Sequence, residues 1–236
     1  MRAEVMTLGT PNPRQREFLA CEKKYVAFGG ARGGGKSWAV RCKAKLLALR
    51  YAGIRILLVR RSLAELEANH LAFLRQELAD VAEYRAGERQ FRFCNGSVLQ
   101  FGYCGCDRDL DRYQGAEYDV IFLDEATQLK EQWMRQIAAC VRGVNDFPKR
   151  IYYTCNPGGP GHGYIKRLFI DRRFEDGEQP EDYAFIPARV TDNAALLARQ
   201  PDYLKTLEAL PYKLRRAWLE GRWDVFAGAG VSGVHR

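Results

Sequence analysis

The chain has 236 residues, of which 47% are hydrophobic and 28% are charged, and its formal net charge is +8. This composition is typical of a soluble globular protein with a sizeable core, without internal repeats or long low-complexity segments. No apolar run approaches the roughly 18 residues that a membrane helix needs, and the first residues lack the apolar region of a signal peptide, so no membrane partner is expected. The positive charge favours polyanionic partners such as nucleic acid, although a merely basic surface would give the same net charge.

The 7 cysteines are scattered along the chain and form no C-x-x-C pair. Cys104 and Cys106 are separated by a single residue, which is too short for a usual zinc knuckle, and only 3 histidines are present to assist them. This pattern predicts buried, reduced thiols in a cytosolic protein and no structural zinc.

The predicted elements alternate along the chain. Helices are predicted over 13–21, 37–49, 63–78 and 131–141, and strands over 25–28, 55–59, 90–94, 97–103, 120–123, 151–154 and 183–186. Apolar strands separated by helices favour an α/β fold with a mainly parallel sheet covered on both faces. Asn95-Gly96 is the strongest two-residue hairpin signal, and it predicts an inserted antiparallel β-hairpin over 90–103.

Towards the C-terminus the sequence predicts short helices. Asp192 can cap one helix, Pro201 opens a second, and Pro211 starts a third that stops at Gly221. The predicted organisation is a core domain over 1–190, a small helical subdomain over 191–226 and a flexible glycine-rich linker over 227–236. A linker at this place predicts that the chain is a fragment of a longer protein.

A phosphate-binding loop lies between the first strand and the helix that follows it. The pattern G-x-x-x-x-G-K-[ST] is complete here, as Gly30-Ala31-Arg32-Gly33-Gly34-Gly35-Lys36-Ser37. A strand that enters a glycine turn and leaves as a helix directs several backbone N–H groups and the helix N-terminus at one point, which makes an anion site. Lys36 would reach the β- and γ-phosphates of a nucleoside triphosphate, and the Ser37 hydroxyl would bind Mg²⁺. The alternative is a structural glycine turn.

The stretch 118–125 is an apolar strand that ends in two carboxylates, Asp124 and Glu125. A buried strand places Asp124 at its carboxyl end beside the phosphate loop, where it can hold Mg²⁺ through water or Ser37. Glu125 points elsewhere because side chains alternate along an extended chain, and it is placed to polarise a water for attack on the γ-phosphate. A glutamate directly after the magnesium carboxylate favours hydrolysis. The alternative is a strand that ends at a solvated acidic turn.

Four further residues are candidates for the same site. Arg32 could place its guanidinium on the γ-phosphate and stabilise charge in the transition state, or it points to solvent. Thr154 and Asn156 follow a strand and could bond the γ-phosphate or the attacking water, although Asn-Pro also marks ordinary turns. The amide of Gln15 can read both the donor and the acceptor of the adenine edge, or it lies on a helix surface.

Taken in order, these motifs resemble the ATPase domain of the large terminase subunit, the DNA-packaging motor of tailed bacteriophages and related prophages. The resemblance covers about residues 10–226 and rests on Gln15, the loop 29–37, the stretches 113–117 and 123–127, the segment 154–162 and the ending 219–223. Its most specific part is Asp124-Glu125-Ala126-Thr127 followed by the Asn-Pro-Gly-Gly-Pro-Gly-His segment.

The resemblance implies a P-loop NTPase fold of the additional-strand, catalytic-glutamate type with a small helical lid, and it implies hydrolysis of ATP with Mg²⁺. The implied roles are phosphate binding by Lys36, magnesium binding by Ser37 and Asp124, water activation by Glu125, and coupling of hydrolysis to movement by Thr154 and Asn156. In relatives a second arginine enters a neighbouring subunit's site from just before the inserted hairpin. By position this residue is Arg89 here, with Arg92 next.

The implied partners are double-stranded DNA, the portal protein of the procapsid and the small terminase subunit. The resemblance implies a ring of subunits, a pentamer, on the portal and a monomer in isolation, in the cytoplasm of the infected bacterial host. Large terminase subunits normally carry a C-terminal nuclease, which this chain lacks, so DNA cleavage is not expected.

Two other functions share Lys36, Asp124 and Glu125. A RecA-like helicase or another nucleic-acid-dependent P-loop ATPase would lack the segment 154–162. A nucleotide switch that binds without turnover would not need Glu125 or Arg32, and a phosphate-release assay separates it from an ATPase.

Overall fold

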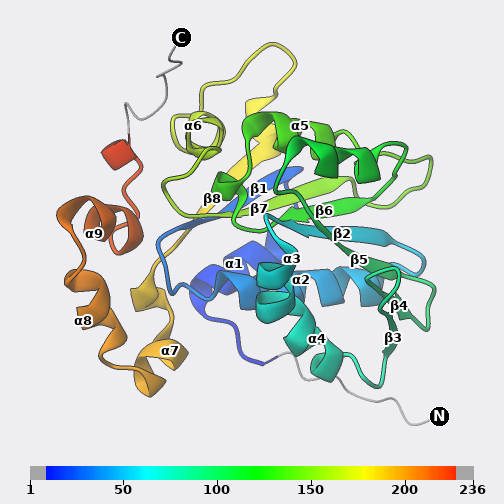
Figure 1. Cartoon of the computed structure of the whole chain (residues 1–236), viewed down its shortest axis with the longest axis horizontal. Helices are drawn as coiled ribbons and strands as arrows, with labels where there is room; N and C mark the ends of the chain where they lie inside the picture. Colours follow the sequence, from blue (N-terminus) through cyan, green and yellow to red (C-terminus); the bar gives the residue numbers. More distant parts are fainter. Residues whose placement is uncertain (1–8, 227–236) are drawn as a thin grey trace.

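The computed structural model describes residues 9–226, and its centre is one twisted sheet (Figure 1). The strands are β1 Tyr25–Gly30, β2 Arg55–Arg60, β3 Ala82–Arg85, β4 Gln90–Phe93, β5 Val98–Tyr103, β6 Val120–Leu123, β7 Arg150–Cys155 and β8 Tyr183–Ala188. Their order is β3-β4-β5-β2-β6-β7-β1-β8. In this order, each neighbouring pair of strands between β5 and β8 is parallel. The strand β4 is antiparallel to both β3 and β5. The predicted α/β class and mainly parallel sheet are therefore confirmed.

Helices cover both faces of the sheet, and further helices lie beside it. The α-helices are α1 Pro13–Ala20, α2 Lys36–Arg50, α3 Leu63–Leu66, α4 Ala72–Glu77, α5 Glu131–Ala138, α6 His162–Ile165, α7 Ala194–Arg199, α8 Tyr203–Glu208 and α9 Tyr212–Trp218. In Figure 1, α1 to α4 lie below the sheet and α5 and α6 lie above it. None of the helices within residues 9–226 is long and apolar enough to cross a membrane.

The two faces of the sheet contribute to two separate core clusters. On β7, Tyr152 packs into the cluster with Phe18 and Phe28, whereas its neighbour Tyr153 packs into the cluster with Trp133. Successive side chains of a strand point to opposite faces, so a strand that is covered on both sides must be apolar along its whole length. This explains why the central strands read as unbroken apolar runs, and it leaves polar residues for the strand ends.

The predicted helix over 63–78 is not continuous. A π-helical turn, Glu67–Leu71, joins α3 to α4, and the Ala72 N–H donates to the Glu67 carbonyl, five residues back. The extra residue in this turn brings His70 and Leu71 together into the interior. The strand β3 and the helix α6 were not predicted. β3 is short and only half-buried, and α6 directly follows a glycine-rich segment.

The predicted hairpin is present, but its turn is not the two-residue type. A two-residue mirror-image turn of the Asn-Gly type needs positive φ at both central residues, and here Gly96 has φ of 83° while Asn95 is not in that region. The Asn95 side chain instead accepts from the Ser97 N–H at 3.1 Å and donates to the Ala48 carbonyl at 2.8 Å. The asparagine therefore ties the hairpin to the end of α2.

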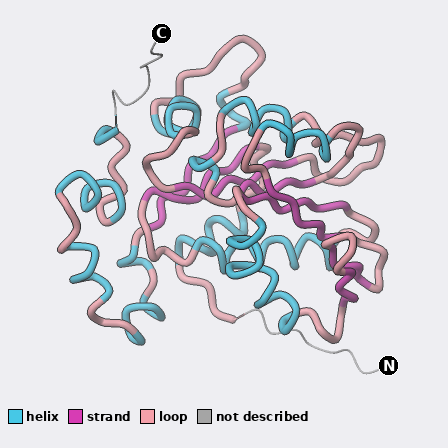
Figure 2. Tube along the Cα trace, viewed as in Figure 1, coloured by secondary structure: helices cyan, strands magenta, loops and turns pink. Residues whose placement is uncertain are grey.

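The three C-terminal helices α7 to α9, which we call the lid segment (194–218), form a column beside the sheet (Figures 1 and 2). Asn193, and not the predicted Asp192, caps α7 by accepting from the Leu196 N–H. Asp192 accepts from the Arg189 N–H one turn earlier. The predicted linker over 227–236 lies outside the described residues, and the domain division stays a prediction.

Candidate nucleotide-binding site

The phosphate loop connects β1 to α2, as predicted. Gly30, Gly33 and Gly35 have φ of 112°, 77° and 76°, a region that favours glycine. Within residues 9–226, the N–H groups of Gly33, Gly34 and Gly35 have no hydrogen-bond partner. A helix of 15 residues begins directly afterwards at Lys36. Free N–H groups in front of a helix N-terminus form an anion site.

This loop borders a cavity of about 520 Å³, which Ser37, Glu65, Glu125, Asn156 and Tyr203 also line. The cavity therefore combines phosphate-loop N–H groups with a hydroxyl and two carboxylates. It is large enough for a nucleotide, whose binding sites are commonly several hundred cubic ångströms.

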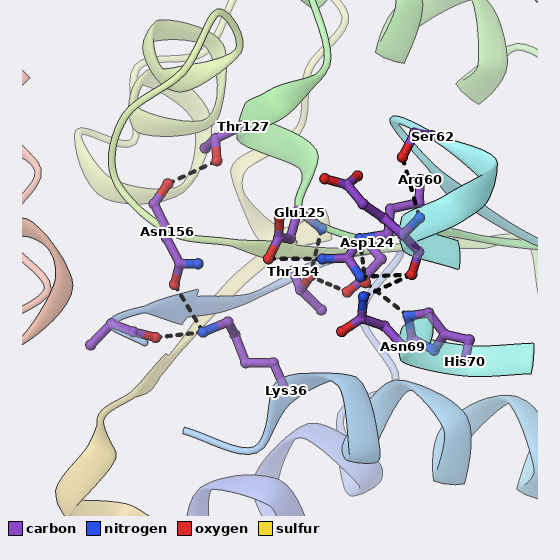
Figure 3. Close-up of polar contacts among 12 residues, drawn as sticks. Lys36, Arg60, Ser62, Asn69, His70, Asp124, Glu125, Thr127, Thr154 and Asn156 are labelled. Carbon is purple, nitrogen blue, oxygen red and sulfur yellow. Dashed lines mark hydrogen bonds and ion pairs between the residues drawn. The ribbon is translucent and has the colours of Figure 1, made fainter. Parts of the chain in front are cut away.

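Lys36 lies at the floor of the cavity, held by protein oxygens. Its ammonium donates to the Ala31 carbonyl and, at 2.9 Å, to the side-chain oxygen of Asn156 (Figure 3). Burial lowers the pKa of Lys36, and the negative groups around it, Glu125 and Asp124 among them, oppose this effect. A phosphate that enters the loop would replace these two oxygens as the partner of the ammonium.

Asp124 is almost fully buried at the end of β6. The Thr154 hydroxyl donates to its Oδ1 at 2.5 Å, and the His70 Nε2 lies 2.8 Å from its Oδ2. The Arg60 Nε is 3.5 Å from the same Oδ2. Burial alone would raise the pKa of Asp124, but His70, Arg60 and the Thr154 hydroxyl outweigh it and hold the pKa well below its usual range. The carboxylate is therefore ionised, as a magnesium ligand must be.

Glu125 is the only one of the two predicted carboxylates that reaches the cavity within the described part of the chain. Its backbone has φ of 52°, and its N–H donates to the Thr154 hydroxyl at 2.8 Å. Its Oε1 pairs with the Arg60 Nη2 at 2.9 Å. A left-handed conformation at a residue other than glycine stores strain, which gathers at functional sites. Thr154 thus joins Asp124 and Glu125, as Figure 3 shows.

Arg32 is turned towards the lid segment. Its guanidinium lies 3.4 Å from the ring centre of Trp218, and its backbone N–H donates to the Trp218 carbonyl at 2.8 Å. Arg32 and Glu125 also line a second cavity of about 250 Å³ between the segment 156–159 and α9. The predicted contact of Arg32 with the γ-phosphate stays a prediction, and reaching it would require the guanidinium to leave the indole.

The amide of Gln15 lies behind the phosphate loop. It donates to the Gly35 carbonyl at 3.0 Å and accepts from the Asn12 N–H at 2.8 Å, and the cavity lining does not include it. In this arrangement Gln15 supports the loop, and its predicted contact with adenine stays a prediction.

Comparison with known proteins identifies the family. A family model described as "Terminase large subunit, T4likevirus-type, N-terminal" matches residues 27–229. The chain belongs to this family. No curated protein sequence matches the chain.

Solved structures of large terminases share the fold of this terminase chain. A large terminase from a thermophilic bacteriophage in complex with ADP superposes with a TM-score of 0.72 at 16% identity, over 90% of this chain and 53% of that chain. The same protein in complex with ATP-gamma-S superposes with a TM-score of 0.71 at 16% identity, over 90% of this chain and 52% of that chain. The large terminase ATPase domain of Thermus phage P74-26 superposes with a TM-score of 0.64 at 15% identity, over 91% of this chain and 94% of that chain. The terminase chain thus spans about half the length of the large terminase in the first two structures, and the P-loop NTPase fold is confirmed.

The two arginines predicted to act on a neighbouring subunit do not line either of these cavities. Arg89 lies directly before β4 with φ of 50°, and its guanidinium is 5.7 Å from the ring centre of Tyr103. Arg92 pairs with Glu88 at 2.8 Å. Which arginine of this terminase acts in a neighbour stays a prediction.

Sequence reasoning missed Arg60, His70 and Trp218. Arg60 had a signal, because it ends an apolar strand next to β6 and must therefore lie beside Asp124. His70 had none, because the π-helical turn that directs it inwards has no recognisable pattern. Trp218 is brought to the loop by the lid segment, whose packing the sequence does not reveal.

The predicted metal ligands fit Mg²⁺. No cluster of three metal-ligating His, Cys, Asp or Glu residues occurs within residues 9–226. Mg²⁺ bound with a nucleotide needs only one or two protein oxygens, with phosphate and water completing its octahedron. The Ser37 hydroxyl beside the cavity and the ionised Asp124 behind it are oxygen donors of this kind.

Proposed function

We propose that this terminase chain hydrolyses ATP to ADP and phosphate and that this reaction drives double-stranded DNA into a procapsid. The observation that carries the proposal is that Lys36, the free N–H groups of the phosphate loop and the Glu125 carboxylate border one cavity. The family supports it, as do the ADP and ATP-gamma-S complexes of the similar large terminase.

The proposed reaction uses the groups of the cavity in turn. The loop N–H groups and Lys36 bind the β- and γ-phosphates, and Mg²⁺ held by Ser37 and Asp124 would neutralise charge on them. Glu125 leaves Arg60, orients a water and accepts its proton as the water oxygen attacks the γ-phosphorus. The bond from that phosphorus to the bridging oxygen breaks, so ADP is the leaving group. Arg32 would stabilise the charge that develops.

The test compares the ATP turnover of two variants, each of which replaces one glutamate that lines the cavity. Glu125→Gln should bind nucleotide like the parent but lose about 10²–10⁴-fold in turnover, since the amide cannot accept the proton. Glu65→Gln is the matched control, because the Glu65 side chain lines the same cavity but has no part in the proposed reaction, so this variant should turn over normally. The proposal fails if the Glu125 variant hydrolyses ATP at near the parent rate.

We further propose that assembled subunits complete each other's sites. The portal protein, the small terminase subunit and a ring of five subunits are the partners proposed for this chain, and the isolated chain should be a poor ATPase. If Arg89 acts in a neighbour, mixing Arg89→Ala with Glu125→Gln subunits should restore part of the activity in mixed rings. A fully active Arg89→Ala ring would leave Arg92 or Arg32 as the candidates.

DNA binding should depend on backbone phosphates, because a motor that moves along any duplex gains nothing from reading bases. The net charge of +8 supports such binding. We expect weak, sequence-independent binding that falls steeply with salt. Strong preference for one DNA sequence at moderate salt would contradict the proposal.

A further inference from the structure

His70 is a fully buried polar residue with no role in the mechanism above. Its side chain has 0% exposure, and its Nε2 lies 2.8 Å from Oδ2 of Asp124. The other carboxylate oxygen of Asp124 accepts from the Thr154 hydroxyl at 2.5 Å. Figure 3 shows the two partners on either side of the carboxylate. Because each carboxylate oxygen makes a hydrogen bond, rotation of the carboxylate about the Cβ–Cγ bond of Asp124 would break both of them.

The donor in this pair is the histidine. Within residues 9–226 the His70 Nδ1 has no hydrogen-bond partner. An ionised carboxylate can only accept, so His70 Nε2 is the donor of this hydrogen bond.

The backbone around His70 is built to aim it. The residue belongs to the π-helical turn Glu67–Leu71, and such turns frequently occur at functional sites. The Asn69 carbonyl within this turn accepts from Arg41 Nη1 at 2.7 Å. At the end of α4, Glu77 pairs with Lys45 at 2.6 Å.

Both of these cations, Arg41 and Lys45, are buried residues of α2, the helix that begins with Lys36. The segment that carries His70 is thus fixed to the helix that follows the phosphate loop. A histidine so placed sets the position of the Asp124 carboxylate relative to the Ser37 hydroxyl. Groups that bond a metal ligand from behind orient it and raise metal affinity.

We propose that His70 is a positioning residue, which holds the Asp124 carboxylate in the orientation that binds the Mg²⁺ of the Mg²⁺–nucleotide complex. The inference rests on the proposed function, because it takes Asp124 as the magnesium ligand. His70 touches neither nucleotide nor metal, and it acts through Asp124 alone.

The test measures Mg²⁺ affinity and not turnover. A fluorescent ADP analogue is titrated with the chain in EDTA and then with Mg²⁺ at saturating nucleotide. His70→Leu and His70→Asn should weaken Mg²⁺ binding about 10–100-fold and leave nucleotide affinity in EDTA unchanged. His70→Gln, whose amide reaches further than that of Asn and can donate to Asp124, should recover most of the affinity.

Two controls separate positioning from a general structural role. His162→Gln changes another buried histidine, which stacks on Trp223 at 5.2 Å between ring centres, and it should leave Mg²⁺ affinity unchanged. In an Asp124→Asn background, His70→Leu should cause no further loss, because the group it acts through is gone.

The outcomes are distinct. Unchanged Mg²⁺ affinity in the Leu and Asn variants overturns the inference, and so does an equal loss of nucleotide affinity in EDTA. If the Leu variant does not fold, the comparison of Asn with Gln decides: equal Mg²⁺ affinities overturn the inference. A parent chain that binds no nucleotide would overturn the proposed function, and this inference with it.

Discussion

The ammonium group of Lys36 donates to the side-chain oxygen of Asn156 at 2.9 Å, across 120 residues of sequence. The backbone carbonyl of Asn156 accepts from the Thr127 hydroxyl at 2.8 Å, so this asparagine joins the phosphate loop to the turn after β6. A phosphate that takes Lys36 must therefore displace Asn156. The coupling role predicted for Asn156 stays a prediction, and this contact supports it.

Asn156→Asp should weaken nucleotide binding at least about tenfold. The new carboxylate would pair with Lys36 and repel the phosphates, at nearly the size of the asparagine. Asn156→Ala removes the competing oxygen without adding charge and should bind within about threefold of the parent. Titration with a fluorescent ATP analogue measures both variants. An Asp variant that binds as tightly as the parent would rule out a shared position for Asn156 and the phosphate.

Trp218 should report the movement of Arg32. If a γ-phosphate draws the guanidinium from its place 3.4 Å from the Trp218 ring centre, the surroundings of that indole change. Trp38 lines the nucleotide cavity and would respond to either nucleotide, so the measurement uses a Trp38→Phe background. In this background we expect ATP-γ-S, but not ADP, to change the tryptophan emission. Trp218→Phe should lose the change. An identical response to both nucleotides would show that Arg32 does not respond to the γ-phosphate.

Two glycines of the segment after β7 should respond oppositely to alanine. A Cβ at Gly159 would lie 2.3 Å from the Thr127 carbonyl oxygen, where φ is also 98°, so Gly159→Ala should cost about 2–4 kcal/mol of unfolding free energy. Gly163 lies in α6 and a Cβ there meets nothing within 4 Å. Gly163→Ala should gain up to about 1 kcal/mol. Urea unfolding of the two variants measures the difference, and equal stabilities would refute the tight contact.

Lys43 should make stability depend on pH. Burial, helped by the charge of Arg150, lowers its pKa to about 8 from the ordinary 10.5. Between these values the unfolded chain binds more protons than the folded chain, so the contribution of Lys43 to stability rises with pH. Below pH 8 both states are protonated, and the charged lysine costs up to about 3 kcal/mol.

The measurement compares Lys43→Met with the parent by denaturant unfolding at several pH values. The advantage of the variant over the parent should shrink as the pH rises from 8 to 10. Lys23→Met, at an exposed position, should show a constant difference. A constant difference for Lys43→Met as well would mean that the Lys43 ammonium is not destabilised by burial.

Local patterns were enough to predict much of the fold. The apolar strands, the phosphate loop and the paired carboxylates each depend on residues close in sequence, and the parallel sheet then brings the ends of β1, β6 and β7 together. This geometry places five predicted site residues at one edge of the sheet. Lys36 bonds to Asn156 there, and Thr154 bonds to both Asp124 and Glu125.

What the sequence could not predict depends on distant packing. The inward turn of His70 arises from one extra residue in a helical turn, and the stack of Arg32 on Trp218 arises from a segment more than 180 residues away. The sequence motif predicted that Gln15 contacts adenine. In the structure its amide donates a hydrogen bond to the Gly35 carbonyl, because the capping of α1 directs it there. Such contacts join residues that are far apart in the sequence, so local patterns do not predict them.

The close approach of Gly221 to Gly30 has a mechanical consequence. A Cβ at Gly221 would lie 2.8 Å from the Gly30 carbonyl oxygen, so the two backbones meet with no side chain between them. Peptide groups are rigid, so one that moves displaces the other directly, whereas an intervening side chain could absorb the displacement by changing its rotamer. Tension applied to the chain beyond Trp223 would therefore act on the phosphate loop directly. The rate at which nucleotide leaves the site should then depend on load, which an optical trap can measure on a chain held by its two ends.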